Sequence, residues 1–268
     1  MQHLFLFIKY DSRIPLRSRI DHDTHYQRLL VNIRFMASLD KGGLDQYNGV
    51  FHEMGHSVHG AGVKQKYVID KNVNLTYPYE MGAFSEGISM MFEKVNLEPD
   101  WFVKYADYAN AKKTKAEIQK IKGAFAEYEA KSKPWDGYST RKLLSRVYFE
   151  RSMYKNPDAD YSKLWWDSLQ KILLVERHDN LPHWAHKSHW IGNPGMYQDY
   201  VIADLISSQN IHYFKQKYGK FVDNPNVGRE LVQKYFVPGN TVPWDQMVKN
   251  LTGEKLNPQY RIDEMTKF

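Results

Sequence analysis

Apolar residues recur at helical spacing along most of the chain, so the pattern predicts a protein built mainly of α-helices. The clearest stripe consists of Leu44, Tyr47, Phe51, Met54 and Val58, which share one face of a helix. Further helices are predicted over residues 100–110, 113–132, 138–154, 159–175, 195–219, 227–236 and 244–251.

Two short runs near the start, Leu4–Ile8 and Leu29–Phe35, have the composition of β-strands. They predict a small N-terminal β-sheet beside a helical core. Pro78 is well placed to open the helix that follows it, because proline is favoured in the first helical turn. With 268 residues and 42% hydrophobic content, the chain can bury a large core, and we expect a single domain over residues 1–268.

Composition narrows the possible partners. The net charge of +6 is mild, and the lysine-rich stretch 112–133 contains interspersed glutamates, which is typical of a solvated helix face rather than of a nucleic-acid-binding arm. No apolar run approaches the roughly 18 residues of a membrane span. The chain has no cysteine, which excludes disulfides and thiolate chemistry.

The stretch His52-Glu53-Met54-Gly55-His56 carries the strongest chemical signal. Histidines four residues apart on a helix share a face, so His52 and His56 can hold one Zn²⁺ through two imidazole nitrogens. Glu53 can take a proton from an activated water and pass it to a leaving amine. The alternative is that the two histidines merely share a helix face.

A zinc enzyme of this kind needs a third protein ligand and an open position for water. Glu86 lies among the apolar residues Phe84, Ile88, Met91 and Phe92, which predict a buried helix. A carboxylate there is costly unless it is paired or bound to a metal. Glu86 is therefore the candidate third ligand, and the alternative is a glutamate that bridges to a surface lysine or caps a turn.

These residues resemble the gluzincin metallopeptidases. Phe51–His56 followed by Phe84-Ser85-Glu86 is similar to motifs of the angiotensin-converting enzyme family and of thimet-type oligopeptidases. The resemblance covers Leu29 to Gly253. Its other parts are Tyr161–Trp166, Lys187-Ser188-His189, the pair Tyr197 and Tyr200, Pro243–Met247 and Leu251–Gly253.

The resemblance implies roles for four further residues. His189 would hydrogen-bond the substrate backbone, and Tyr200 would donate to the oxyanion of the intermediate. Lys187 and Tyr197 would hold the free C-terminal carboxylate of a peptide. Without the family, Lys187 can be a solvated loop lysine, and the two tyrosines can be ordinary core residues at helical spacing.

Together the resemblance implies a helical gluzincin core with one Zn²⁺ per chain that hydrolyses short peptides, as a peptidyl-dipeptidase or an oligopeptidase. The chain resembles the C-terminal catalytic half, without the N-terminal lid. This leaves three alternatives: a partner chain that supplies the missing half, an open substrate channel, or a truncated gene product. A non-catalytic zinc- or peptide-binding module, or one subunit of a two-chain peptidase, are the alternatives. The converting-enzyme family implies a secreted or periplasmic location, and an oligopeptidase a cytoplasmic one.

Three departures from the family pattern bear on the site. Met90 stands where the converting-enzyme family has an acidic partner for a zinc histidine, so we expect weaker zinc binding or another supporting carboxylate. Asp199 replaces a chloride-binding arginine, so no chloride activation is expected. The spacing from His189 to Tyr200 is intermediate between the two family patterns.

By resemblance, Leu29–Phe35 is a candidate edge strand for binding extended peptide, with a plain core strand as the alternative.

Overall fold

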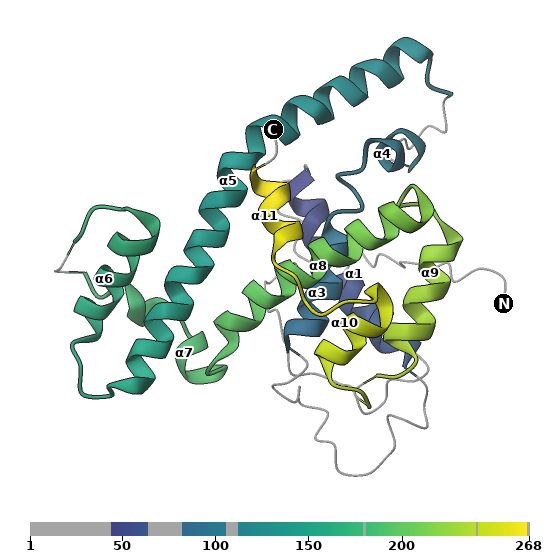
Figure 1. The fold of residues 1–268 in the computed structure, drawn as a ribbon. Coiled ribbons are helices and arrows are strands. Elements are labelled where there is room, and N and C mark those ends of the chain that lie inside the picture. The colour runs from purple at the N-terminus through teal and green to yellow at the C-terminus, as the bar shows by residue number, and fades with distance from the viewer. Residues whose placement is uncertain (1–43, 64–81, 106–111, 179–180, 240, 267–268) are drawn as a thin grey trace, which may run out of the picture.

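The computed structural model describes residues 44–63, 82–105, 112–178, 181–239 and 241–266, and every regular element in these ranges is helical (Figure 1). The prediction of a mainly helical protein is confirmed for this part of the chain. The elements are α1 (Leu44–Gly62), α3 (Gly82–Glu93), α4 (Pro99–Tyr105), α5 (Lys115–Lys155), α6 (Tyr161–Leu173), η3 (His183–His186), α7 (His189–Gly192), α8 (Met196–Tyr218), α9 (Pro225–Leu231), η4 (Val232–Phe236), α10 (Trp244–Thr252) and α11 (Gln259–Thr266).

Several predictions near the N-terminus fall outside the described ranges. These are the β-sheet of Leu4–Ile8 and Leu29–Phe35, and the role of Pro78. None of the described helices is both long and apolar enough to cross a membrane.

The main hydrophobic core is built around α3, which packs between α1 and α8. Phe84, Ile88 and Met91 of α3 are fully buried against Ile206 and Phe214 of α8. This burial explains why α3 is apolar on nearly all sides, as expected for a helix enclosed by others.

Two glycines allow these helices to approach closely. A Cβ atom added at Gly55 of α1 would lie 2.8 Å from the Cα of Ser89 on α3. A Cβ added at Gly87 of α3 would lie 2.9 Å from the Cγ2 of Ile206 on α8. Helix α3 is therefore held close to α1 on one side and close to α8 on the other. This packing fixes the positions of the α3 side chains relative to those of α1.

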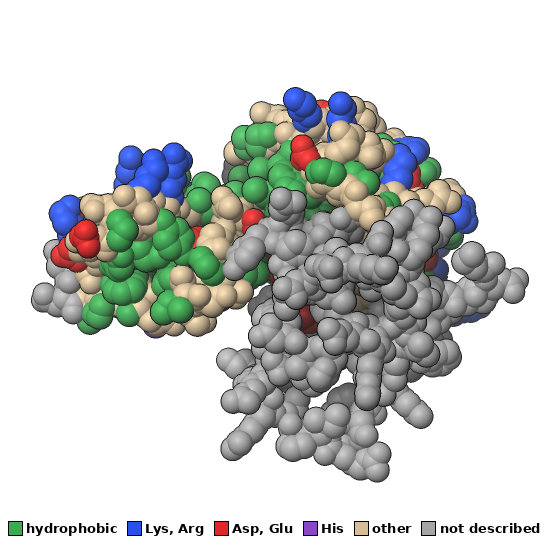
Figure 2. Space-filling model, turned by 90° about the horizontal axis from the view of Figure 1, so that it is seen from below, with side chains coloured by type: hydrophobic (Ala, Val, Ile, Leu, Met, Phe, Trp, Pro, Cys, Tyr) green, Lys and Arg blue, Asp and Glu red, His purple; other side chains and the backbone are tan. Residues whose placement is uncertain are grey.

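A second, aromatic cluster joins α5, α6, α7 and the start of α8. The ring of Phe149 lies 5.1 Å from that of Trp165 and 5.1 Å from that of Trp190, both edge-on. Tyr197 at the start of α8 completes the cluster, with its ring 4.6 Å from Trp190. Helix α8 therefore spans both cores, and Figure 1 shows it running from α7 into the body that contains α3. Figure 2 shows hydrophobic side chains exposed over the smaller lobe, which carries α6.

Helix α5 differs from its prediction. The stretches 113–132 and 138–154 form one helix of 41 residues with Pro134 inside it. Proline removes one backbone hydrogen bond, but Ala130 and Pro134 are both exposed, so water can solvate the carbonyl that loses its partner. A capping box of Thr114 and Glu117 fixes the start of the helix, and its lysine-rich first half is largely exposed, as the charge pattern predicts.

Two more differences occur near the C-terminus. The predicted helix 227–236 is α9 followed directly by a π-helical turn, η4. Helix α11 was absent from the prediction because its anchor is polar: the buried Arg261 donates to Asp204 of α8 at 2.7 Å. The C-terminal end of α8 is tied to α9 by Glu230, whose carboxylate accepts from Tyr213 at 2.9 Å and from Lys217 at 2.9 Å.

Candidate metal centre

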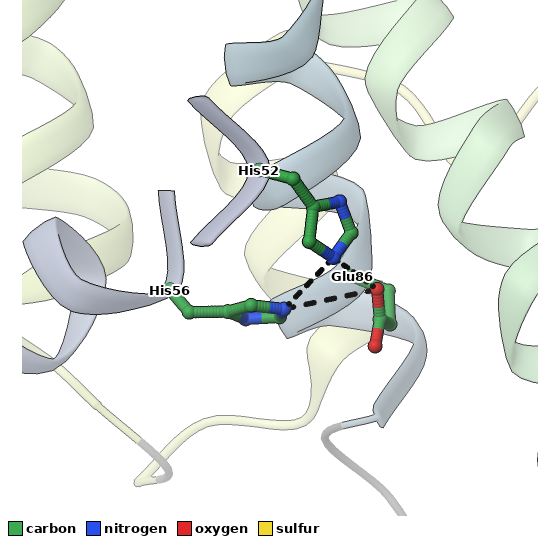
Figure 3. Close-up of side chains that lie close together, drawn as sticks. All are labelled: His52, His56 and Glu86. Carbon is green, nitrogen blue, oxygen red and sulfur yellow. Dashed lines mark hydrogen bonds and ion pairs between the residues drawn. The ribbon is translucent and has the colours of Figure 1, made fainter. Parts of the chain in front are cut away.

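Three side chains from two helices converge on one point (Figure 3). His52 and His56 extend from one face of α1, and the carboxylate of Glu86 reaches them from α3. The two Nε2 atoms lie 3.2 Å apart. The Oε2 atom of Glu86 lies 3.3 Å from the Nε2 of His52 and 3.8 Å from that of His56. Within the described ranges this is the one group of histidine and acidic side chains arranged to hold a metal ion.

The separations match what zinc requires. Zinc binds nitrogen and oxygen ligands at about 2.0–2.1 Å in a tetrahedron, whose edges are then about 3.3–3.4 Å. The three ligand atoms, all within 4.8 Å of one another, form one face of such a tetrahedron with little adjustment. Two histidines and one glutamate leave the fourth position open, as a catalytic zinc site does and a structural site does not.

The other ring nitrogens of both histidines are held by α3. The Nδ1 of His52 lies 2.5 Å from Oε1 of Glu93, and the Nδ1 of His56 lies 2.9 Å from Oγ of Ser85. Such contacts fix each ring and turn its Nε2 atom toward the metal. Because Met90 stands where the family has an acidic partner for a zinc histidine, another supporting carboxylate was expected. Glu93, one turn further along α3, is a carboxylate in that role.

The same contacts control the protonation of His52. Burial lowers its pKa, but hydrogen bonds with Glu86 and Glu93 outweigh burial and raise the pKa to about 10. A metal-free site therefore keeps a proton on this ring, and zinc must displace it, since a ligating imidazole is neutral.

Glu53 and Tyr200 belong to the same electrostatic environment. Glu53 follows His52 on α1 and is half-buried. Burial, and then the negative charges of Glu86, Asp199 and Glu53, raise the pKa of the half-buried Tyr200. The phenol of Tyr200 therefore stays protonated and can only act as a hydrogen-bond donor or a neutral acceptor.

His189, Tyr197 and Tyr200 lie together at the junction of α7 and α8. The ring of His189 is 5.3 Å from that of Tyr197 and 6.5 Å from that of Tyr200, and the two tyrosine rings are 6.3 Å apart. The structure thus groups these three predicted residues. The charges of Glu86 and Glu53 act on the pKa of Tyr200.

Glu150 holds this junction in place. Its buried carboxylate, on α5, accepts from the backbone N–H of Gly195 at 2.7 Å, immediately before α8. Burial raises its pKa, and hydrogen bonds from the backbone of Gly195 and Tyr197 partly oppose that rise. Gly195 has φ of 82°, a left-handed conformation that favours glycine. Sequence reasoning missed Glu150, because nothing in the pattern of α5 distinguishes it from its solvated glutamates.

Lys187 lies between η3 and α7, two residues before His189. It is half-buried, and burial, followed by the charges of Arg146 and Lys142, lowers its pKa. Arg146 places its guanidinium carbon 5.2 Å from the centre of the Tyr197 ring. The sequence predicted Lys187 and Tyr197 as neighbours, but not the two cations that α5 adds.

Asp199 is buried between Tyr197 and Tyr200 in sequence and packs against Gly82, the first residue of α3. Burial, then the charges of Glu86 and Glu150, raise the pKa of Asp199 to about 6. A buried acid at this position fits the expectation that no anion such as chloride binds there, because a second negative charge would be repelled.

A bundle of helices with a His/His/Glu group and an adjacent glutamate defines the class of helical metallopeptidases with an HExxH motif. Residues 29–267 match Peptidase family M3, and the chain belongs to that family. Members of that family are zinc-dependent metallopeptidases, in agreement with the class of enzyme that the resemblance predicts. The specificity of the converting-enzyme family stays a prediction.

Comparison with solved structures supports the fold. The structure entitled "BsuCP Crystal Structure" superposes with a TM-score of 0.57 at 20% sequence identity. The alignment covers 81% of this chain and 46% of the other, so the chain spans about half the length of that protein. No curated protein matches the sequence.

Proposed function

We propose that the chain hydrolyses short peptides with one zinc ion held by His52, His56 and Glu86. The observation that carries this proposal is the convergence of three ligand atoms within 4.8 Å, one residue from Glu53, in a member of Peptidase family M3. Bound zinc would supply Lewis acidity to the scissile carbonyl and to a water molecule.

The side chains would then divide the remaining work. Glu53 takes a proton from the attacking water and delivers it to the leaving nitrogen. Tyr200, kept protonated by its environment, donates a hydrogen bond to the developing oxyanion, and His189 binds the adjacent substrate backbone. Glu150 positions both groups indirectly, because it holds the turn from which α8 begins.

For the substrate end, we propose that Lys187 and Tyr197 bind the C-terminal carboxylate, which would make the chain a peptidyl-dipeptidase. A charge-assisted hydrogen bond to a carboxylate contributes more than one to a neutral amide. Peptides with a free C-terminus should therefore be cleaved faster than their amides. Equal rates on both, with internal cleavage of longer peptides, would indicate an oligopeptidase instead.

Glu53→Gln tests the catalytic proposal, with Glu129→Gln on the exposed face of α5 as the matched control. The amide cannot accept a proton, so we expect turnover to fall by on the order of 10²-fold or more while zinc content and melting temperature stay unchanged. The control should keep full activity. A wild-type chain that holds stoichiometric zinc but cleaves no peptide in a short-peptide library would establish the non-catalytic zinc- or peptide-binding module.

A further inference from the structure

A group of cations borders the candidate active site on the side of Tyr197. Lys142 and Arg146 are one helical turn apart on α5, so their side chains leave the same face of that helix. Lys187, in the segment between η3 and α7, lies near enough to Arg146 and Lys142 for their charges to act on it. That segment is fixed against α5 at both ends, because the rings of Trp184 and Trp190 lie 6.4 Å and 5.1 Å from Phe149, one turn beyond Arg146.

No acidic residue within the described ranges neutralises the group: none forms an ion pair with Lys142, Arg146 or Lys187. The buried acid nearest in sequence, Glu150, is occupied by the backbone N–H groups at the start of α8. Burial, and then the charges of Arg146 and Lys142, lower the pKa of Lys187. Like charges held together at a folding cost commonly mark a place where an anion binds.

The contact of Arg146 with Tyr197 orients its guanidinium group so that it can bind a carboxylate. Its guanidinium lies over the ring of Tyr197, at 5.2 Å from the ring centre. Stacking uses the face of a guanidinium and leaves the N–H groups in its plane free to bind a carboxylate with two hydrogen bonds. Because the ring of Tyr197 is 6.3 Å from that of Tyr200, the cations lie next to the groups assigned to the scissile bond.

We propose that Lys142, Arg146 and Lys187 form a cationic subsite that binds peptide carboxylates and selects substrates ending in an acidic residue. The inference rests on the proposed peptidase function and extends it. One C-terminal carboxylate leaves most of the positive charge uncompensated, whereas a C-terminal glutamate or aspartate brings a second carboxylate on the same residue.

Four labelled peptides that differ only at their last residue test the subsite: C-terminal Glu or Gln, each as the free acid or the amide. Binding is measured by fluorescence anisotropy to the zinc-loaded Glu53→Gln protein, which cannot consume them. We expect the Glu free acid to bind about tenfold more tightly than either singly charged peptide, because it forms one more hydrogen bond between charged groups. The Gln amide should bind most weakly, and added salt should reduce every difference. The two singly charged peptides show whether the C-terminal or the side-chain carboxylate contributes more.

Three variants and one control assign the effect to this subsite. Arg146→Gln should remove most of the discrimination, and Arg146→Lys should restore part of it. The side chain of Lys142 is exposed, so Lys142→Gln should fold normally and reduce the discrimination about two- to fourfold, as expected for a charge screened by solvent. Lys120→Gln removes the same charge from a distant exposed position on α5 and should change nothing.

The possible outcomes separate the subsite from the catalytic proposal. Equal binding of all four peptides, or undiminished discrimination in both Lys142→Gln and Arg146→Gln, would overturn the subsite. Cleavage of all four by the wild-type chain at equal kcat/KM would leave the peptidase standing and refute the selectivity. Charge-dependent binding without cleavage would support the subsite and refute the peptidase.

Discussion

Gly55 lies where α1 meets α3, and replacing it with alanine should disturb the metal centre without touching a ligand. The added Cβ would lie 2.8 Å from the Cα of Ser89, and backbone cannot move aside as a flexible side chain can. Carbon atoms pack at about 3.5–4.0 Å, so the two helices must separate by roughly 0.7–1.2 Å at this contact.

The displacement acts on the ligands directly, because His52 and His56 are on α1 and Glu86 is on α3. Metal–ligand distances tolerate about 0.2 Å, so a shift of this size should reduce zinc affinity by on the order of 10- to 100-fold or more. Overpacking costs about 1–3 kcal/mol, and alanine returns up to about 1 kcal/mol in helix propensity, which leaves a net loss of roughly 0–2 kcal/mol.

Gly49→Ala is the matched control, since it makes the same change on α1 with no atom within 4 Å of the new Cβ. Zinc affinity is measured by competition with a chromophoric chelator, and stability by thermal unfolding followed by circular dichroism. Gly49→Ala should bind zinc as the wild type does and melt at the same or a slightly higher temperature. If Gly55→Ala binds zinc with wild-type affinity, the close contact between α1 and α3 does not set the ligand geometry.

The remaining predictions concern the ligands and the acid stability of the fold. Glu86→Ala should abolish stoichiometric zinc binding, and Glu93→Gln should weaken it by about 10- to 100-fold, both measurable by metal analysis after dialysis against a weak chelator. Although burial raises the pKa of Glu230, hydrogen bonds from Lys217, Lys234 and two tyrosines lower it from the ordinary 4.5 to about 2. This stabilisation is fully present above pH 4.5 and is lost as the pH falls toward 2; at 1.36 kcal/mol per pKa unit it amounts to at most about 3 kcal/mol. Glu230→Gln should therefore lower the free energy of unfolding at pH 7 and flatten its decline between pH 4.5 and 2, which urea titrations at several pH values would measure.

The convergence of the three candidate zinc ligands could be predicted because their geometry is largely local. The spacing of His52 and His56 fixes their common face as soon as α1 is a helix, and a buried carboxylate in an apolar helix leaves few roles open for Glu86. The supporting groups could not be predicted in the same way. Glu93 and Glu150 acquire their roles only through the contacts of α3 with α1 and of α5 with α8, and single-sequence patterns carry no information on such contacts.

Some of the helices could likewise be predicted from the sequence, and others could not. The stretches of α6 and α10, whose apolar periodicity is strong, were predicted to within a few residues, and so was that of α8. The stretches 113–132 and 138–154 were predicted as separate helices, whereas the structure joins them through Pro134, which the exposure of that turn makes tolerable. Helix α11 is held to α8 by a hydrogen bond from Arg261. Because this contact is polar, the pattern of hydrophobic residues did not predict the helix.

The order of the site along the chain has a consequence for its assembly during synthesis. The metal ligands occur early and close together in sequence, whereas Tyr200 and its neighbours follow only after the whole of α5 and α6. Contacts of low sequence separation form fastest, so α1 and α3 can capture zinc before α8 has been made. A chain that stops short, or in which α8 docks incorrectly, could still contain one zinc per molecule. We therefore expect metal content to overestimate the fraction of competent enzyme in any preparation, and titration with a tight-binding peptide inhibitor to measure it correctly.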